Sequence, residues 1–191
     1  DIEISDDDIR EYYEENKNQY DKVSFRLAYF PIETKADATD DEKDELKEEA
    51  KAKALEFLDK AVDGETFKTL VKEKEEADEL AYYEGLDEEK KAEYDEDKEE
   101  EEKALQEKLA TMTEEEIAAF ESAKANADYS IIYSMVKSNI DNASTEMGTW
   151  LFDLSRNYGD KEAFLSGNGF YAIYFISRDT TVTLPSARHI L

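Results

Sequence analysis

The chain has no cysteine and a single histidine, His189, and these two shortages exclude whole classes of site. Without cysteine there can be no disulfide, no thiolate nucleophile and no thiolate metal ligand. One histidine excludes a multi-histidine metal centre. A serine triad would have to use a histidine almost at the end of the 191 residues, which is a poor place for one. We therefore expect no metal ion and no cofactor.

Long apolar runs are also missing, since no stretch is apolar over the length needed to cross a bilayer. The sequence begins at Asp1 without a methionine and shows no secretion signal. We therefore expect it to be cropped or processed at its front and to stop within a strand at its back. Any membrane attachment would then come from an anchor outside these residues.

Basic residues are in the minority, with 24 lysines and arginines against 51 aspartates and glutamates, so the formal net charge is −27. Nucleic acids and anionic membrane surfaces repel such a chain, and both are poor partners. The charge suits cationic ligands or basic unfolded polypeptides instead. With 12% aromatic residues, the chain can still build a packed core.

Two stretches have the composition of buried strands. Residues 23–32 are an apolar run of β-branched and aromatic residues ended by Pro31, which predicts a central strand. Residues 170–176, FYAIYFI, are the strongest strand signal in the chain. Apolar residues at helical spacing predict a helix over residues 41–62, stopped by Gly64, and a short helix starting at Thr66. These elements predict an α+β fold.

Polar helices are predicted before and between these elements. Residues 1–21 are predicted to form a linker helix with a capping box at its start. Residues 73–143 read as an acidic helical insertion, because much of this stretch is too polar to form a core. Its last helix is expected to begin at Asp128. The residues predicted to share one face of that helix are Tyr129, Ile132, Tyr133, Val136 and Ile140. Residues 150–153, WLFD, are expected to be extended.

Four short motifs follow one another in a fixed order. They are Asp63-Gly64-Glu65-Thr66-Phe67, Glu146-Met147-Gly148-Thr149-Trp150, Gly169-Phe170-Tyr171-Ala172-Ile173 and Ala187-Arg188-His189-Ile190-Leu191. Their order, after a first strand, resembles the parvulin family of peptidyl-prolyl cis-trans isomerases. It is most similar to the extracytoplasmic foldases of the PrsA and SurA type. The resemblance covers residues 23–71 and 147–176, and it implies that the first and last strands lie side by side.

The resemblance also implies a site and shows where this chain departs from it. Family members place one histidine in the first strand and one in the last, where this chain has Leu27 and Tyr171. No catalytic residue is therefore assigned, and His189 would belong to the following domain. The residues expected to bind peptide are Tyr29, Trp150, Phe152, Phe164 and Tyr171. Isomerisation needs no obligatory nucleophile, so the missing histidines make efficient catalysis a poor expectation without forbidding it.

The resemblance divides the chain into a parvulin-like domain over residues 22–72 and 144–183, interrupted by the insertion. Residues 184–191 would be the first strand of a following, truncated parvulin domain. The predicted function is a secreted or surface-anchored bacterial folding factor that binds unfolded or proline-containing polypeptides as a chaperone or scaffold. Two alternatives stay open, an active isomerase with a remodelled site and an acidic, non-catalytic binding module.

Several other features have two interpretations. Trp150 and Phe152 fit either contact with a client or a place in the core. Arg156 with an aspartate at 153 or 160 fits a structural ion pair at a turn better than a catalytic pair. The acidic run 87–102 fits a solvated helix face better than a calcium site, because it lacks the alternating ligands and glycine of a calcium loop. Either client binding or helix packing explains the tyrosines at 12, 13, 20, 82, 83 and 94.

Overall fold

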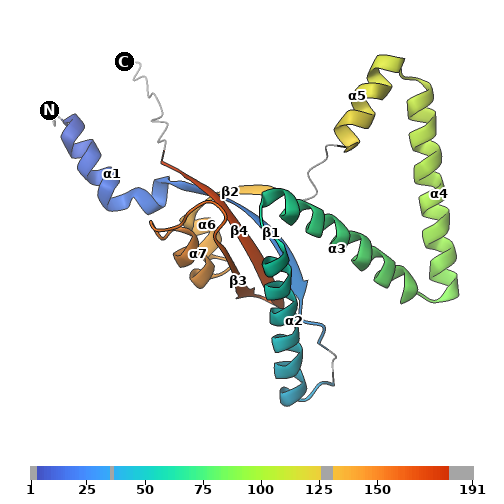
Figure 1. Ribbon diagram of the computed structural model, residues 1–191, viewed down its shortest axis with the longest axis horizontal. Helices are drawn as coiled ribbons and strands as arrows, with labels where there is room; N and C mark the ends of the chain where they lie inside the picture. Colours follow the sequence, from blue (N-terminus) through green and yellow to red (C-terminus); the bar gives the residue numbers. More distant parts are fainter. Residues whose placement is uncertain (1–3, 35–36, 126–130, 181–191) are drawn as a thin grey trace, which may run out of the picture. The chain divides into compact units, whose positions relative to one another are not determined.

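The structure is a computed structural model that describes residues 4–34, 37–125 and 131–180 (Figure 1). Its elements in chain order are α1 Asp6–Tyr20, β1 Lys22–Pro31, α2 Asp40–Lys60, α3 Gly64–Glu84, α4 Glu88–Ala110, α5 Glu114–Ala125, β2 Ile132–Val136, α6 Lys137–Asp141, α7 Thr145–Leu151, β3 Lys161–Ser166 and β4 Gly169–Asp179. The strands form one four-stranded antiparallel sheet in the order β2-β1-β4-β3. The predicted α+β class is therefore confirmed.

The chain divides into two compact units, Asp1–Phe67 with Ser130–Leu191 and Lys68–Tyr129. The first unit holds the whole sheet, α1, α2, α6 and α7. The second consists of helices, namely most of α3 together with α4 and α5. Because the sheet and the residues expected to bind peptide lie in the first unit, the candidate site is built there.

The centre of the sheet is the pairing of β1 with β4. The two strands run antiparallel from the pair Lys22–Asp179 to the pair Pro31–Gly169, with an irregularity next to Ser24. Both strands have a neighbour on each side, so the prediction that these apolar runs are adjacent and central is confirmed. Their large β-branched and aromatic side chains fit this place because both faces of the sheet are covered.

One face of the sheet is covered by α2, which is the helix predicted from its apolar spacing. Thr39 caps this helix, and its backbone and hydroxyl groups bond to the Glu42 side chain, which completes a capping box. The Phe57 ring lies 5.4 Å from Phe30 on β1 and 5.1 Å from Phe67 on α3. These rings form the core between the helix and the sheet.

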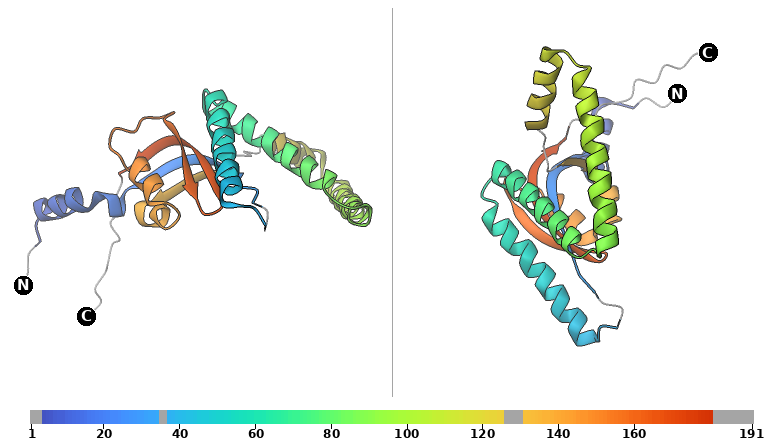
Figure 2. Two further views of the ribbon diagram at one scale, coloured as in Figure 1. Left: turned by 90° about the horizontal axis from the view of Figure 1, so that it is seen from below. Right: turned by 90° about the vertical axis from the view of Figure 1, so that its right-hand side faces the viewer.

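The other face is covered by α6 and α7 (Figure 2). Ile140 and Leu151 from these helices are almost fully buried against side chains of β1 and β4. Gly148 permits the close approach of α6 and α7, because a Cβ atom there would lie only 1.8 Å from the Asp141 carboxylate. The core residues on this face are Val23, Phe25, Ile140, Met147, Leu151, Phe152, Phe164, Ile173 and Phe175.

The expected helix over residues 128–140 is wrong, because Ile132–Val136 form strand β2, paired with β1. Apolar residues lie at almost every position of this segment, so they fit a strand as well as one side of a helix. The exposed edge of β1 offers backbone partners that decide between the two. Tyr133 and Met135 then pack on the core face that α6 and α7 cover.

Two further expectations were wrong. Residues 150–153 are not extended, since α7 runs to Leu151 and turns follow. Ser144 caps this helix by accepting from the Met147 amide, and Met147 and Leu151 lie one helical turn apart on its buried side. Gly64 does not stop α2, which ends at Lys60, but begins α3, and α3 is 21 residues long rather than short.

The second unit shows how a strongly acidic sequence folds with little core. The helix α4 has no buried residue, as its polar composition predicted, and the capping box at Thr113 and Glu116 is present at the start of α5. The Tyr94 ring on α4 lies 5.4 Å from the Tyr83 ring on α3, and the Tyr94 hydroxyl donates to Glu79 at 2.5 Å. Tyrosine contacts therefore join α3 to α4.

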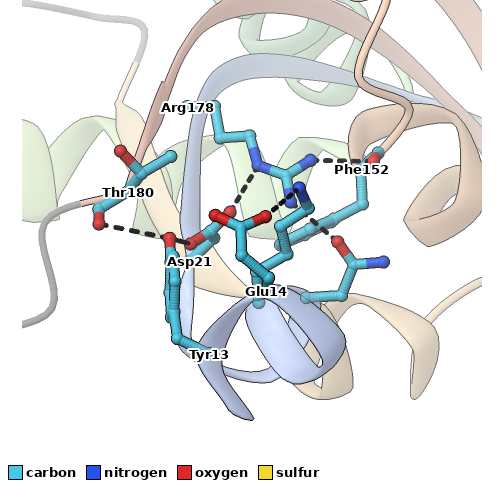
Figure 3. Close-up of polar contacts among 8 residues, drawn as sticks. Tyr13, Glu14, Asp21, Phe152, Arg178 and Thr180 are labelled. Carbon is cyan, nitrogen blue, oxygen red and sulfur yellow. Dashed lines mark hydrogen bonds and ion pairs between the residues drawn. The ribbon is translucent and has the colours of Figure 1, made fainter. Parts of the chain in front are cut away.

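A buried polar cluster ties α1 to the end of the sheet (Figure 3). The Asp21 side chain is 0% exposed and accepts a hydrogen bond of 2.6 Å from Arg178 Nε on β4. Arg178 also donates to the Phe152 carbonyl at 2.9 Å and to Asn18 at 2.7 Å. The Tyr13 hydroxyl donates to the other Asp21 oxygen, and this bond raises the pKa of Tyr13 to about 12. Tyr13 therefore stays a protonated donor at neutral pH.

Replacing Arg178 with methionine should lower the free energy of unfolding by about 3–5 kcal/mol, because it leaves the buried Asp21 carboxylate without its cation. Urea unfolding followed by circular dichroism measures this. Arg10→Met is the matched control, since its ion pair with Asp7 is 71% and 89% exposed and should matter by about 0–1 kcal/mol. Equal effects of the two substitutions would show that the buried cluster does not hold α1 to the sheet.

Deleting residues 73–129 and joining the ends with about 15 flexible glycine and serine residues should leave a sheet unit that unfolds cooperatively. Over its described residues, 73–125, the deleted part contributes no strand, and the deletion keeps Val71, which is buried. A deletion over residues 73–143 is the matched control, because it also removes β2 and Ile140. If the smaller deletion abolished cooperative urea unfolding while the protein was still expressed, the second unit would be part of the same cooperative core.

Candidate functional site

Four of the five residues expected to bind peptide form a continuous row across one face of the sheet. Tyr29 on β1 and Tyr171 on β4 are direct cross-strand partners, with ring centroids 5.2 Å apart. Tyr171 is opposite Phe164 on β3. The Phe164 ring lies 5.6 Å from the Trp150 ring on α7. Because directly opposite residues share a face, these side chains line up, and we call them the aromatic row.

The row passes from solvent into the core. Tyr29 is 37% exposed, whereas Phe164 is 8% exposed and belongs to the buried core. Tyr171 and Trp150 are half-buried and pack against that core. An incoming apolar side chain can therefore reach Tyr29, Tyr171 and Trp150, which Phe164 supports from inside the protein.

Phe152, the fifth residue expected to bind peptide, is not part of this row. It is 4% exposed, and its ring lies 5.3 Å from the guanidinium carbon of Arg178. Its carbonyl accepts a hydrogen bond from the same arginine. Of the two interpretations of Phe152, the structure favours a place in the core.

The two positions at which the parvulin family has histidines lie on this face. Leu27 is two residues before Tyr29 on β1, so both side chains point to the same side, and Leu27 is paired with Ile173. Tyr171 is two residues before Ile173 on β4, which places the two positions on neighbouring strands, one diagonal apart. His189 and the strand expected over residues 184–191 lie outside the described residues.

Gly169, at the start of β4, makes room for the Tyr29 ring. A Cβ atom at Gly169 would lie 2.6 Å from that ring and 2.5 Å from the Phe30 carbonyl, closer than atoms normally approach. The glycine was recognised from sequence as part of a motif, but its contact with Tyr29 was not predicted. A glycine in a strand often marks such a close approach, and this was the available signal.

Arg156 contacts the aromatic row at its Trp150 end. Its guanidinium carbon lies 4.7 Å from the centre of the Trp150 ring, within the range of a cation–π contact. Its terminal nitrogens lie 3.8 Å from Asp153 and 3.6 Å from Asp160. The structure therefore supports the interpretation of these charges as an ion-pair cluster at a turn, and the arginine of this cluster also contacts the Trp150 ring.

The aromatic row can bind but carries no acid–base pair. It offers phenol, phenyl and indole rings, which bury and stack against proline, aromatic and aliphatic side chains. Its four residues include no imidazole or carboxylate. In the described part of the chain, no group of three or more histidine, aspartate or glutamate residues is placed to hold a metal ion. Over the same residues, no helix is both long and apolar enough to cross a bilayer.

A second apolar surface lies on α1 and was not predicted as a pocket. Ile9, Tyr12, Tyr13 and Tyr20 line a hollow of about 470 Å³, together with Thr180 at the end of the sheet unit. The Tyr12 and Tyr20 rings are 6.3 Å apart and both are exposed. Tyr12 and Tyr20 of α1 thus face solvent, whereas Tyr13 bonds to Asp21 and the tyrosines of α3 and α4 contact one another.

Comparisons of the chain with protein-family models, with curated proteins and with solved structures found no match in any of the three.

Replacing Gly169 with alanine should move the Tyr29 ring and lower the free energy of unfolding by about 1–3 kcal/mol, as overpacking does. Ring-current shifts of Tyr29 and Tyr171 in NMR spectra, with urea unfolding, measure the two effects. Gly85→Ala is the control, because a Cβ atom there meets its nearest neighbour at an ordinary 3.4 Å. Unchanged Tyr29 and Tyr171 shifts in the Gly169 variant would refute the close approach.

Proposed function

We propose that this chain is a parvulin-like domain of an extracytoplasmic folding factor, which binds unfolded or proline-containing polypeptides as a chaperone or scaffold. The observation that carries the proposal is the aromatic row, a half-buried line of rings that can hold apolar side chains and has no catalytic acid or base. The client would lie over Tyr29, Tyr171 and Trp150, and the net charge of −27 would favour basic clients.

The order of the elements supports the parvulin-like part of the proposal. A first strand, a helix, a Phe67-containing helix, a segment with Gly148 and Trp150, and a last strand follow one another as the motifs implied. The first and last of these strands, β1 and β4, pair along their whole length. The segment with Trp150 is a helix here, whereas the motif resembled a loop.

The proposed scaffold role follows from the chemistry at the two histidine positions. Isomerisation of a prolyl bond faces a barrier of about 18–20 kcal/mol, and an enzyme lowers it by stabilising the twisted amide and excluding water. With Leu27 and Tyr171 in place of the two histidines, such a site would keep its apolar side chains but lack both imidazoles. The site would then retain binding and lose most of its power to stabilise the twisted amide.

The location outside the cytoplasm and any anchor on a membrane belong to the same proposal, since both come from the foldase resemblance. The absence of cysteine fits an oxidising compartment as well as a reducing one and decides nothing. Client binding and isomerase activity, both of which can be measured on this chain, are therefore the tests of the proposal.

The wild-type chain should slow the aggregation of a chemically unfolded client while accelerating prolyl isomerisation in a short peptide weakly or not at all. Uncatalysed isomerisation takes tens to hundreds of seconds, so even modest catalysis is visible by NMR exchange spectroscopy. A Leu27→His, Tyr171→His double variant should gain isomerase activity if the site has kept its shape.

Tyr171→Ala should weaken aggregation suppression, whereas Tyr82→Ala, which removes a 62% exposed tyrosine outside the row, should not. Strong isomerase activity in the wild-type chain would replace the proposal with an active isomerase that uses a remodelled site. Absence of both activities would favour the acidic binding module. Equal loss of suppression in the two tyrosine variants would show that the row is not the binding surface.

A further inference from the structure

The strand β2 is an edge strand, and in the described part of the chain no strand pairs with its outer side. It pairs with β1 on one side and is the last strand of the sheet on the other. In an antiparallel strand, alternate residues direct their N–H and C=O groups away from the partner. An extended polypeptide can use such groups to add itself to the sheet as a further strand.

The composition of β2 leaves this edge without the usual protection. Residues 131–136 read Ile-Ile-Tyr-Ser-Met-Val, with no charge and no proline, in a chain of which 39% is charged. Ile131 is 63% and Ile132 is 49% exposed. Charged residues and proline are the devices by which proteins normally block an edge strand from pairing with another chain.

The opposite edge of the same sheet shows the contrast. The strand β3 begins with Lys161 and Glu162, and the Lys161 ammonium group donates to the carbonyls of Leu58 and Ala61 at 2.7 and 3.0 Å. The Ser166 hydroxyl donates to the Ala143 carbonyl at 2.8 Å. Side-chain charges and cross-links to neighbouring segments thus protect β3, whereas β2 has neither in the described residues.

The negative charge of the chain favours a basic partner for this edge over a second copy of the chain. A second copy of the chain would bring another net charge of −27 to the contact, which opposes pairing between copies. A basic segment is attracted by the same charge. Lys137, which follows β2, is held by Asp141 at 2.7 Å, so the ion pair compensates its repulsion of a cation.

We propose that β2 captures an extended segment of unfolded polypeptide with alternating apolar and basic residues, as an added strand of the sheet. This inference rests on the proposed function and names how the client is held. Backbone hydrogen bonds along β2 supply sequence-tolerant affinity. Ile132 and its neighbours contact alternate apolar side chains, and the charge of the chain favours the basic ones.

The probe is a peptide of about ten alternating lysine and valine residues, the upper end of the usual strand length and enough to span the five residues of β2. We expect fluorescence anisotropy to show that it binds the full chain, more weakly as salt rises. The same peptide methylated on alternate backbone nitrogens should bind about tenfold more weakly or worse, because the methyl groups remove the hydrogen bonds of one edge. A peptide with glutamate in place of lysine should not bind measurably.

Ile132→Lys should weaken binding of the unmethylated peptide, whereas Leu165→Lys, with the same added charge on the protected edge strand β3, should leave it unchanged. Amide exchange in β2 should slow when the peptide is bound. Equal binding of the methylated and unmethylated peptides would overturn the proposal, as would equal effects of the two lysine variants or no binding at all.

Tyr171→Ala separates this proposal from the proposed function. If that variant loses both aggregation suppression and peptide binding while Ile132→Lys keeps both, the row holds the client and β2 does not. If the wild-type chain fails to suppress aggregation but the peptide still adds to β2, the folding-factor proposal fails and the edge remains a binding site. A dimer in sedimentation experiments that Ile132→Lys dissociates would identify a second copy as the occupant and overturn the proposal.

Discussion

The antiparallel pairing of β1 with β4 is the contact on which the rest of the sheet unit depends. It joins segments separated by most of the chain and turns one face of each strand toward α2 and the other toward α6 and α7. Both cores, the aromatic row and the polar cluster at Arg178 start from side chains on this pair of strands. A slip of one residue in its register would exchange the two faces and separate Tyr29 from Tyr171.

Three surfaces of the sheet unit differ in what they offer a polypeptide. The aromatic row presents rings, the outer edge of β2 presents backbone groups, and the hollow on α1 is a further apolar surface that shares Tyr13 with the Arg178 cluster. None of these depends on a general acid or base. A protein that holds many different clients needs this kind of contact, because rings and backbone groups accept many sequences, whereas catalytic groups require one geometry.

Sequence reasoning succeeded where one strong pattern decided the structure. The runs at β1 and β4 are too apolar for an edge strand, so they predict central strands. The apolar spacing in α2 predicts only a helix. It failed at β2, where the apolar residues at 131–136 fit either element and the free edge of β1 decided between them. For the site, the residue types were predictable from the resemblance, and four of them meet in the row. The close contact between Gly169 and Tyr29 was not predictable, because it depends on the register between Pro31 and Gly169.

The order of the strands along the chain has a consequence for synthesis. Strand β1 leaves the ribosome before its central partner β4, which follows only after the acidic helices and β2 have been made. Until then one side of an apolar strand has no neighbour, and an unpaired strand of this kind is the usual starting point for misassembly. A protein that we propose to be a chaperone for other unfolded chains thus passes through a stage at which its own strand β1 is exposed to misassembly.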